Sequence, residues 1–176
     1  EPDHSGKINV SMLPGDKVAN RDRWSLDLNQ DGNLGHDWLY KVRAERVSDD
    51  DYWKDMSRRV ESQTPRLLAT DFTLNRQREL SWGVIDTYAR VQRWQTLQTN
   101  PASPLIPPYN RSQFTFSASK LNAGYSDLSL YSSADEFTHP SLPNGRRYLA
   151  YPSATLPIQN SFAYVTPKVG MHLTHY

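Results

Sequence analysis

The sequence predicts an all-β protein: an antiparallel up-and-down meander that forms an incomplete arc of a large transmembrane β-barrel. Apolar and polar residues alternate with a period of two along most of the chain, as strands with one apolar face do. Short polar joins near 31–36, 77–80 and 122–124 alternate with long joins at 48–65, 98–111 and 138–146. Transmembrane barrels have this asymmetry, because their periplasmic turns are short and their extracellular loops are long.

About nine strands follow one another, in segments 8–12, 24–28, 38–44, 68–74, 82–97, 114–119, 125–137, 148–156 and 169–173. Each is predicted from apolar residues at every second position, and segments 125–137 and 148–156 are the least regular. The apolar members of the clearest strands are, in chain order, Ile8, Val10 and Met12; Trp24, Leu26 and Leu28; Trp38, Tyr40, Val42 and Ala44; Leu68, Phe72 and Leu74; Ile85, Ala89 and Val91; Phe114, Phe116 and Ala118; and Val169, Met171 and Leu173.

The joins carry ordinary turn chemistry. Asp31-Gly32 and Asn144-Gly145 are dipeptides typical of tight turns. Prolines gather in the long joins, and a short helical turn is predicted at 51–59. Pro152 interrupts a strand-like run, which is tolerated mainly at edges, bulges and strand ends. The chain is therefore predicted to be one β domain without a linker.

Aromatic residues lie near the ends of several predicted strands. They are Trp24, Trp38, Tyr52, Trp53, Trp82, Trp94, Tyr109 and Phe137. Rings at strand ends are expected at membrane–water interfaces, where they form girdles. The alternative is that aromatic residues simply favour strands.

Composition excludes several classes of protein. The chain has no cysteine, so disulfides, zinc–thiolate sites and cysteine nucleophiles are excluded. Twenty basic and nineteen acidic residues are interleaved, without the basic stripe of a nucleic-acid binder. No apolar run approaches the roughly 18 residues of a membrane helix. A mean hydropathy of −0.74 is compatible with a barrel, in which only alternate strand residues face lipid.

No motif for catalysis or for cofactor binding is found, so we expect a protein that is not an enzyme and has no cofactor. The acidic run of Asp49, Asp50 and Asp51 with Asp55 could bind calcium, but its spacing differs from that of an EF-hand and favours a solvated turn. His172 and His175 are predicted to point to opposite faces of a strand, and His139 to be an ordinary surface histidine. No metal site is expected.

Several motifs, in the same order, resemble one family. Segment 46–55 reads RVSDDDYWKD, which resembles the strand end and the Val-Ser-Asp-x-x-Tyr-aromatic-x-Asp loop of LptD, also called Imp or OstA. Further similar segments are MLPGDKV at 12–18, RWQTLQ at 93–98 with PPYNR at 107–111, and PKVGMHLTHY at 167–176. The matches cover nearly all of the chain and are most like betaproteobacterial members. The motif loop includes Ser48, Asp49, Tyr52 and Asp55.

The resemblance implies a role in transport. LptD-like proteins insert lipopolysaccharide into the outer leaflet of the Gram-negative outer membrane. They work with an LptE-like lipoprotein plug inside a large barrel and receive lipopolysaccharide from a periplasmic Lpt bridge through an N-terminal jellyroll. Residues 1–176 would be a partial barrel domain that lacks the jellyroll and the closing strands. It would supply barrel wall, lumen lining and extracellular loops, in contact with outer-membrane lipids and without a nucleic-acid partner.

The polar strand faces are expected to line a hydrated lumen. The candidate residues are Lys41, Arg43, Glu45, Asp71, Asn75, Arg90 and Gln92. The alternative for each is an ordinary solvated strand residue. At the level of function, the alternative is a soluble β-sandwich that binds carbohydrate, which needs two sheets with apolar inner faces. A β-rich hydrolase is a third option that no motif favours.

Overall fold

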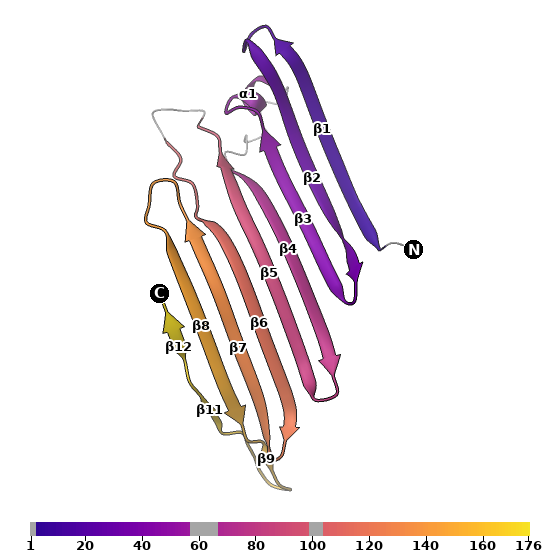
Figure 1. Cartoon of the computed structure of the whole chain (residues 1–176), viewed down its shortest axis with the longest axis vertical. Coiled ribbons are helices and arrows are strands. Elements are labelled where there is room, and N and C mark those ends of the chain that lie inside the picture. The colour runs from indigo at the N-terminus through magenta and orange to yellow at the C-terminus, as the bar shows by residue number, and fades with distance from the viewer. Residues whose placement is uncertain (1–2, 57–66, 99–103) are drawn as a thin grey trace.

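The computed structural model of this chain describes residues 3–56, 67–98 and 104–176. These residues form one long antiparallel sheet whose strands follow chain order from β1 to β8 (Figure 1). The strands are β1 His4–Asp16, β2 Arg21–Gly35, β3 Trp38–Val47, β4 Leu67–Leu80, β5 Gly83–Thr96, β6 Asn110–Ala123, β7 Ser126–Thr138 and β8 Gly145–Thr155. The predicted all-β meander is confirmed, and the sheet is an open arc that does not close on itself.

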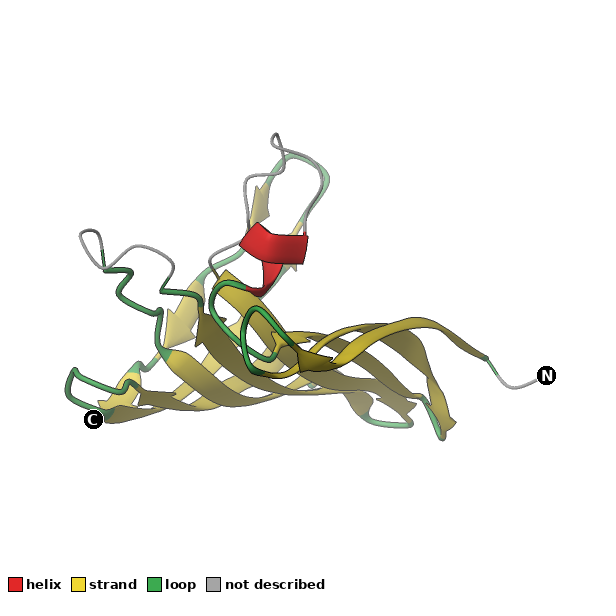
Figure 2. Cartoon of the chain, turned by 90° about the horizontal axis from the view of Figure 1, so that it is seen from above, coloured by secondary structure: helices red, strands yellow, loops and turns green. Residues whose placement is uncertain are grey.

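A helix and four short strands are the remaining elements of the described ranges. Helix α1 spans Tyr52–Met56, within the segment where a helical turn was predicted. The short strands are β9 Ile158–Gln159, β10 Tyr164–Val165, β11 Lys168–Gly170 and β12 Leu173–His175. Strands β9 and β10 pair only with each other, whereas β11 and β12 both pair with β8. Seen from above, the large sheet is a single layer with α1 on one side of it (Figure 2).

The strand ends that flank the long joins lie at one end of the sheet, and the short joins lie at the other (Figure 1). The short joins are residues 36–37, 81–82 and 124–125. Two predicted turns were misplaced: 77–80 belongs to β4, and 31–35 belongs to β2. His36 and Asp37 have φ of 52° and 68°, so this pair makes a two-residue hairpin turn of the kind with two left-handed residues. Two other joins depart from the asymmetry, because β1 and β2 are joined by only residues 17–20 and the β9–β10 hairpin lies at the short-turn end.

The predicted ninth strand, 169–173, is split into β11 and β12. Strand β11 pairs with Ser153–Thr155 of β8, and β12 pairs with residues 148–150. The break lies beside Pro152, which has no backbone N–H to donate to a partner strand. The Pro152 carbonyl still accepts a hydrogen bond of 3.1 Å from the Met171 N–H. Pro152 therefore explains why the outermost strand is discontinuous.

Two glycines allow neighbouring chain segments to approach closely. A Cβ at Gly32 would lie 2.1 Å from the His4 ring, so glycine at this strand position admits the ring and does not form the turn that was predicted. A Cβ at Gly83 would lie 2.1 Å from the backbone carbonyl oxygen of Ser119 on β6. A strand glycine often marks such a close approach of backbones.

The two faces of the sheet differ in character, and among the described residues no second large sheet covers the apolar one. We call the face that carries Trp24, Leu26 and Leu28 the apolar face, and the opposite one the polar face. On the apolar face of β1, Ile8, Val10 and Met12 are 63%, 57% and 74% exposed. The polar face instead holds buried side chains, including Ser25, Ser133, Asp135 and Ser153. No second large sheet packs on either face within the described ranges, so the sandwich alternative is not supported.

The small apolar core lies at the long-loop end. It consists of Val47, Tyr52, Leu68 and Leu97, with Trp53 packed against it. Here β3 and β4 separate, because their pairing ends at Ala44 and Thr70. The side chain of Gln95 takes the place of the missing partner: it donates to the Val47 carbonyl at 2.8 Å and accepts from the Val47 N–H at 3.2 Å.

Only part of the predicted aromatic girdle lies on the apolar face. Trp24 and Trp38 share that face. The prediction is wrong for Trp94 and Phe137, which lie on the polar face opposite Ala69 and Arg111. It is also wrong for Tyr52, which is buried by the loop that contains it.

We expect Gly83→Ala to lower the free energy of unfolding by about 1–3 kcal/mol, because the added methyl group must displace the β6 backbone. Gly145→Ala is the matched control, since a Cβ there meets nothing within 4 Å. Its effect should stay within about 0.5 kcal/mol. Urea unfolding followed by tryptophan fluorescence measures both, and equal losses for the two variants would contradict the close approach.

Candidate functional site

All seven candidate residues share the polar face. Arg43 pairs directly with Asp71, which pairs with Gln92 on β5, and paired residues of adjacent strands point to the same side. The other four join this face through their own register: Lys41 and Arg90 both oppose Thr73, Asn75 opposes Leu39, and Glu45 opposes Asp27. The period-two pattern therefore sorted these residues correctly between the faces.

Charges on the polar face are paired across and along the strands. Arg90 forms a forked ion pair with Asp71 of the neighbouring strand, with its Nε 2.9 Å from one carboxylate oxygen. Arg43 donates to Glu45 two residues away at 2.8 Å. Both pairs are partly exposed, and together they leave this region of the face polar but nearly neutral.

A second ionic group on the same face was not found from the sequence. Asp135 on β7 lies between Arg111 on β6 and Arg147 on β8, at 2.7 and 3.0 Å. Its side chain is fully buried. Arg111 also stacks over the ring of Phe137, with its Cζ 5.5 Å from the ring centroid. Each residue occupies a polar-face position, but only the register of three strands shows that they meet.

The motif loop folds over the polar face of β2. Its anchor is Arg23, which is 1% exposed and donates to both carboxylate oxygens of Asp49, at 3.0 and 2.9 Å. The same guanidinium donates to Asp55 on α1 at 2.9 Å and to Asp16 at the end of β1 at 3.3 Å. One arginine therefore ties the β1–β2 hairpin to the following loop.

Tyr52 and Ser48 complete this anchor. The Tyr52 hydroxyl donates to the hydroxyl of Ser25 at 3.1 Å, and its ring packs under the Arg23 guanidinium. The hydroxyl of Ser48 donates to Asp49 at 2.7 Å. The four motif residues, Ser48, Asp49, Tyr52 and Asp55, thus act together, whereas the roles of Arg23 and Asp16 were not predicted. Asp16 lies within the family-like segment 12–18 and Arg23 in the polar stretch after it, and neither position gives a sign of burial in the sequence alone.

Opposing effects set the pKa of Asp49. Burial by itself raises it, because a charged carboxylate is disfavoured away from water. Hydrogen bonds from Ser48 and Arg23, with the positive charges of Arg23 and Arg21, outweigh burial and hold the pKa below its ordinary value. The Asp49 carboxylate is therefore ionised and remains paired with Arg23.

The other two loops at this end are held together by His139, which is buried and not the surface residue that was predicted. Its Nδ1 accepts from the N–H groups of Ser141 and Leu142 at 3.1 and 2.9 Å. Nε2 must then carry the proton, and it donates to the Pro107 carbonyl at 2.8 Å. Tyr109 reinforces this contact by donating to the Pro143 carbonyl at 3.1 Å.

A metal site is not indicated. Across residues 3–56, 67–98 and 104–176, no three His, Asp or Glu side chains are arranged to hold a metal ion. The carboxylates of Asp49 and Asp55 bind Arg23 instead. His172 and His175 contact Tyr151 and Tyr148, which alternate between faces of β8, as predicted. The same ranges contain no helix of the length and apolar character required to cross a bilayer.

The sequence is similar to proteins of one family over nearly its full length. The family model described as "LptD: LPS transport system D" matches residues 21–176. The LPS-assembly protein LptD of Nitrosomonas eutropha is 35% identical over 173 residues, which is 97% of this chain and 24% of that protein. Those of Chromobacterium violaceum and of a Polaromonas species are 33% and 34% identical over the whole chain, which covers 22% and 23% of their lengths.

The chain thus spans about a quarter of the length of the curated relatives it matches. These relatives are mostly betaproteobacterial, as the motifs predicted. The family match covers β2 through β12, together with the motif loop and its anchor Arg23. The chain belongs to the LptD family.

Proposed function

We propose that this chain forms part of the wall of an outer-membrane β-barrel that inserts lipopolysaccharide into the outer leaflet. The observation that carries the proposal is the uncovered apolar face of the sheet, on which Ile8, Val91 and Phe114 remain exposed. A wall between lipid and water requires such a face. Family membership supplies the lipopolysaccharide, since the similar proteins are named for its assembly. The role proposed is transport, without catalysis by this chain.

The apolar face would meet the membrane. Strands β1 to β8 contain between 10 and 15 residues, and about 9–11 tilted residues suffice to cross a bilayer. Their backbone groups are paired across the sheet, as the hydrocarbon core demands. Exposed Phe72, Val91 and Phe114 on this face would contact acyl chains.

The polar face would line a hydrated lumen. Its paired charges, such as Arg90 with Asp71, can lie beside water, sugar groups or another protein without leaving an isolated charge. In this proposal the lumen also holds an LptE-like lipoprotein plug. The seven candidate residues, Lys41, Arg43, Glu45, Asp71, Asn75, Arg90 and Gln92, are the proposed lining.

The related proteins are much longer than this chain, so further strands and domains are expected to contact it. The edges β1 and β11–β12 of the open sheet would pair with further barrel strands in a protein about four times as long as this chain. Lipopolysaccharide would arrive from a periplasmic Lpt bridge through an N-terminal domain. The ends with long joins at 48–65, 98–111 and 138–146 would be extracellular, and the short turns periplasmic. The loop anchored by Arg23 would then cover part of the lumen at its outer end.

A lysine at Phe116 should impair assembly into the membrane, because it places a charge on the lipid face at a cost of about 2–4 kcal/mol. Val42→Lys on the same face should act in the same direction. Thr115→Lys, next to Phe116 but on the polar face, is the control, together with Arg43→Ala. Heat-modifiable migration of the full-length protein after membrane insertion measures assembly. Equal assembly of Phe116→Lys and Thr115→Lys would rule out the proposed faces.

Removal of the anchor should release the motif loop from β2. Arg23→Gln removes the buried ionic partner of Asp49 and leaves it only the exposed Arg21 at 3.2 Å, and loss of a buried partner typically costs about 3–5 kcal/mol. Ser25 lies under Tyr52, so a cysteine at Ser25 should react with a water-soluble maleimide much faster in the Arg23→Gln background. A cysteine at exposed Ser11, which pairs with Ser25 across the hairpin, should react equally in both backgrounds. An unchanged rate at position 25 would argue against this anchor.

Acid should loosen the same loop. The pKa of Asp49 is lower in the folded protein than in the unfolded chain, so its contribution to stability is present above about pH 4 and is lost as pH falls further. Cleavage of the loop by pepsin should therefore rise steeply below about pH 4. Asp49→Asn cannot titrate at this position, so its cleavage should depend less on pH. A wild-type profile as flat as that of Asp49→Asn would contradict the assignment.

A further inference from the structure

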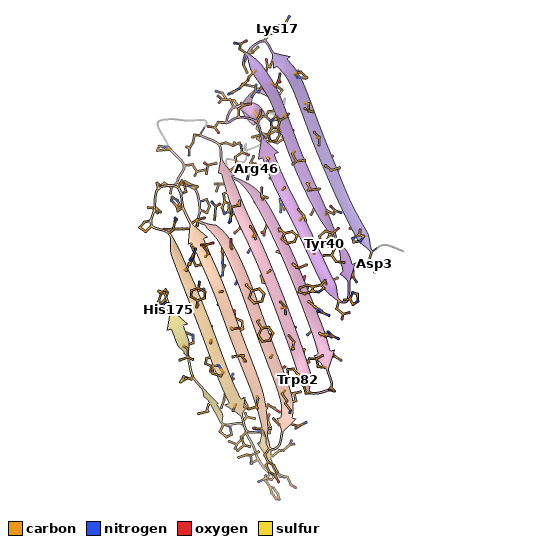
Figure 3. All side chains as sticks on the ribbon, viewed as in Figure 1. Asp3, Lys17, Tyr40, Arg46, Trp82 and His175 are labelled. Atoms are coloured by element: carbon orange, nitrogen blue, oxygen red, sulfur yellow. The ribbon has the colours of Figure 1, made fainter. Side chains whose placement is uncertain are left out.

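A band of polar side chains crosses the apolar face near the long-loop end. It runs from Arg46 on β3, whose Nε donates to Thr70 at 3.2 Å, to Arg93, which pairs with Thr70 in the register. Arg93 in turn donates to the hydroxyl of Ser112 at 3.3 Å. The band continues through Glu136, which pairs with Ser112, to Arg146, 2.8 Å from Glu136. In Figure 3, Arg46 lies toward the long-loop end of β3 and Trp82 at the opposite end of the sheet.

The charges in this band are not balanced. Glu136 is its single acidic member and is paired with Arg146. Among the residues placed by the structure, no carboxylate lies within salt-bridge distance of Arg46 or Arg93. Their hydrogen-bond partners are neutral: hydroxyl groups and, for Arg93, the carbonyl of Gln92. This differs from the polar face, where Arg90, Arg111 and Arg147 each have a carboxylate.

An apolar groove begins directly beside the band. It has a volume of about 320 Å³ and includes Val91, Phe114 and Tyr148. The small side chains of Ala89 and Ala134 form its floor on either side of Phe114 in the cross-strand register. Ser112, Glu136 and Arg146 border it at the polar band. The groove therefore has an apolar body with a polar, partly cationic end, which is the shape and polarity of a lipid.

The spacing of the two unbalanced arginines limits the head group. Arg46 and Arg93 lie on strands β3 and β5, two strand spacings apart, which is roughly 10 Å. Each guanidinium group is suited to binding one phosphate in a forked geometry, so the pair of arginines is suited to two phosphates. Two phosphates held apart on one rigid head group can reach both.

We propose that Arg46 and Arg93 bind a diphosphorylated, multiply acylated glycolipid of the outer leaflet on the outside of the barrel wall, with one acyl chain in the Phe114 groove. The inference rests on the proposed function, because it needs the apolar face in a bilayer and the long loops outside. It assigns a lipid site to the outer surface of the wall, separate from the proposed lumen on the other side of the sheet.

The test uses the full-length protein in detergent, titrated with purified diphosphoryl lipid A and examined by native mass spectrometry. The double variant Arg46→Gln/Arg93→Gln should weaken binding by about fivefold for each arginine, as expected for removing a cation beside an anionic lipid surface. Arg78→Gln is the matched control. Arg78 also belongs to the apolar face, where it is exposed, but it lies near the short-turn end, so its loss should leave binding unchanged.

Two comparisons make the result specific. Arg46→Lys/Arg93→Lys should retain most of the binding, because the charges remain. Monophosphoryl lipid A should bind wild-type protein more weakly, and a single glutamine substitution should then have less effect. Wild-type affinity in the glutamine double variant would overturn the proposal, as would an equal loss for phosphatidylglycerol, which has one phosphate. If the double variant does not assemble, the single glutamine variants provide the same test. The Phe116→Lys assembly experiment tests the proposed function independently.

Discussion

A single layer of strands cannot bury its apolar side chains against a second layer, and most of the structure follows from this constraint. Phe72, Val91 and Phe114 stay exposed on one face, while Asp135 and Ser133 are covered on the other. The buried apolar core is confined to a small cluster near Val47, beneath the motif loop. Stability of the sheet must therefore come largely from its backbone ladders and cross-strand pairs, and the environment outside must accept the apolar face.

Within the part of the chain that the structure describes, Arg46 and Arg93 on the apolar face lack the carboxylate partners that arginines have on the polar face, and that Arg146 has in Glu136. On the polar face, Arg90, Arg111 and Arg147 lie against carboxylates of neighbouring strands, so their charge is neutralised within the protein. Arg46 and Arg93 on the apolar face hydrogen-bond only neutral groups among the described residues. An arginine that is paired with a carboxylate adds no net charge to a water-filled interior. An arginine without such a carboxylate favours binding of an anionic group from outside the protein.

The sequence predicted correctly those features that depend on residues close together in the chain. The alternation of apolar and polar residues in β3, β4 and β5 placed Arg43, Asp71 and Gln92 on one face. The motif loop was identified from its amino-acid sequence. Contacts between distant segments could not be predicted. Arg23 meets Asp49 and Asp55 only because a loop folds back over β2, and Asp135 needs the register of three strands. Turn positions failed for a related reason: Gly32 was assigned to a turn, but it is a strand residue that admits the His4 ring.

The early end of the β3–β4 ladder has a mechanical consequence. These strands share seven residue pairs, from Trp38 to Ala44, whereas β4 and β5 share fourteen. Beyond Ala44 the described residues bridge the seam through side chains, with Gln95 bound to the Val47 backbone and Arg46 donating to Thr70, and not through a backbone ladder. The shorter ladder makes the β3–β4 seam the expected joint between two panels of the sheet, β1–β3 and β4–β8. Arg46 belongs to one panel and Arg93 to the other, so a ligand that bridges these arginines would act as a brace across the joint.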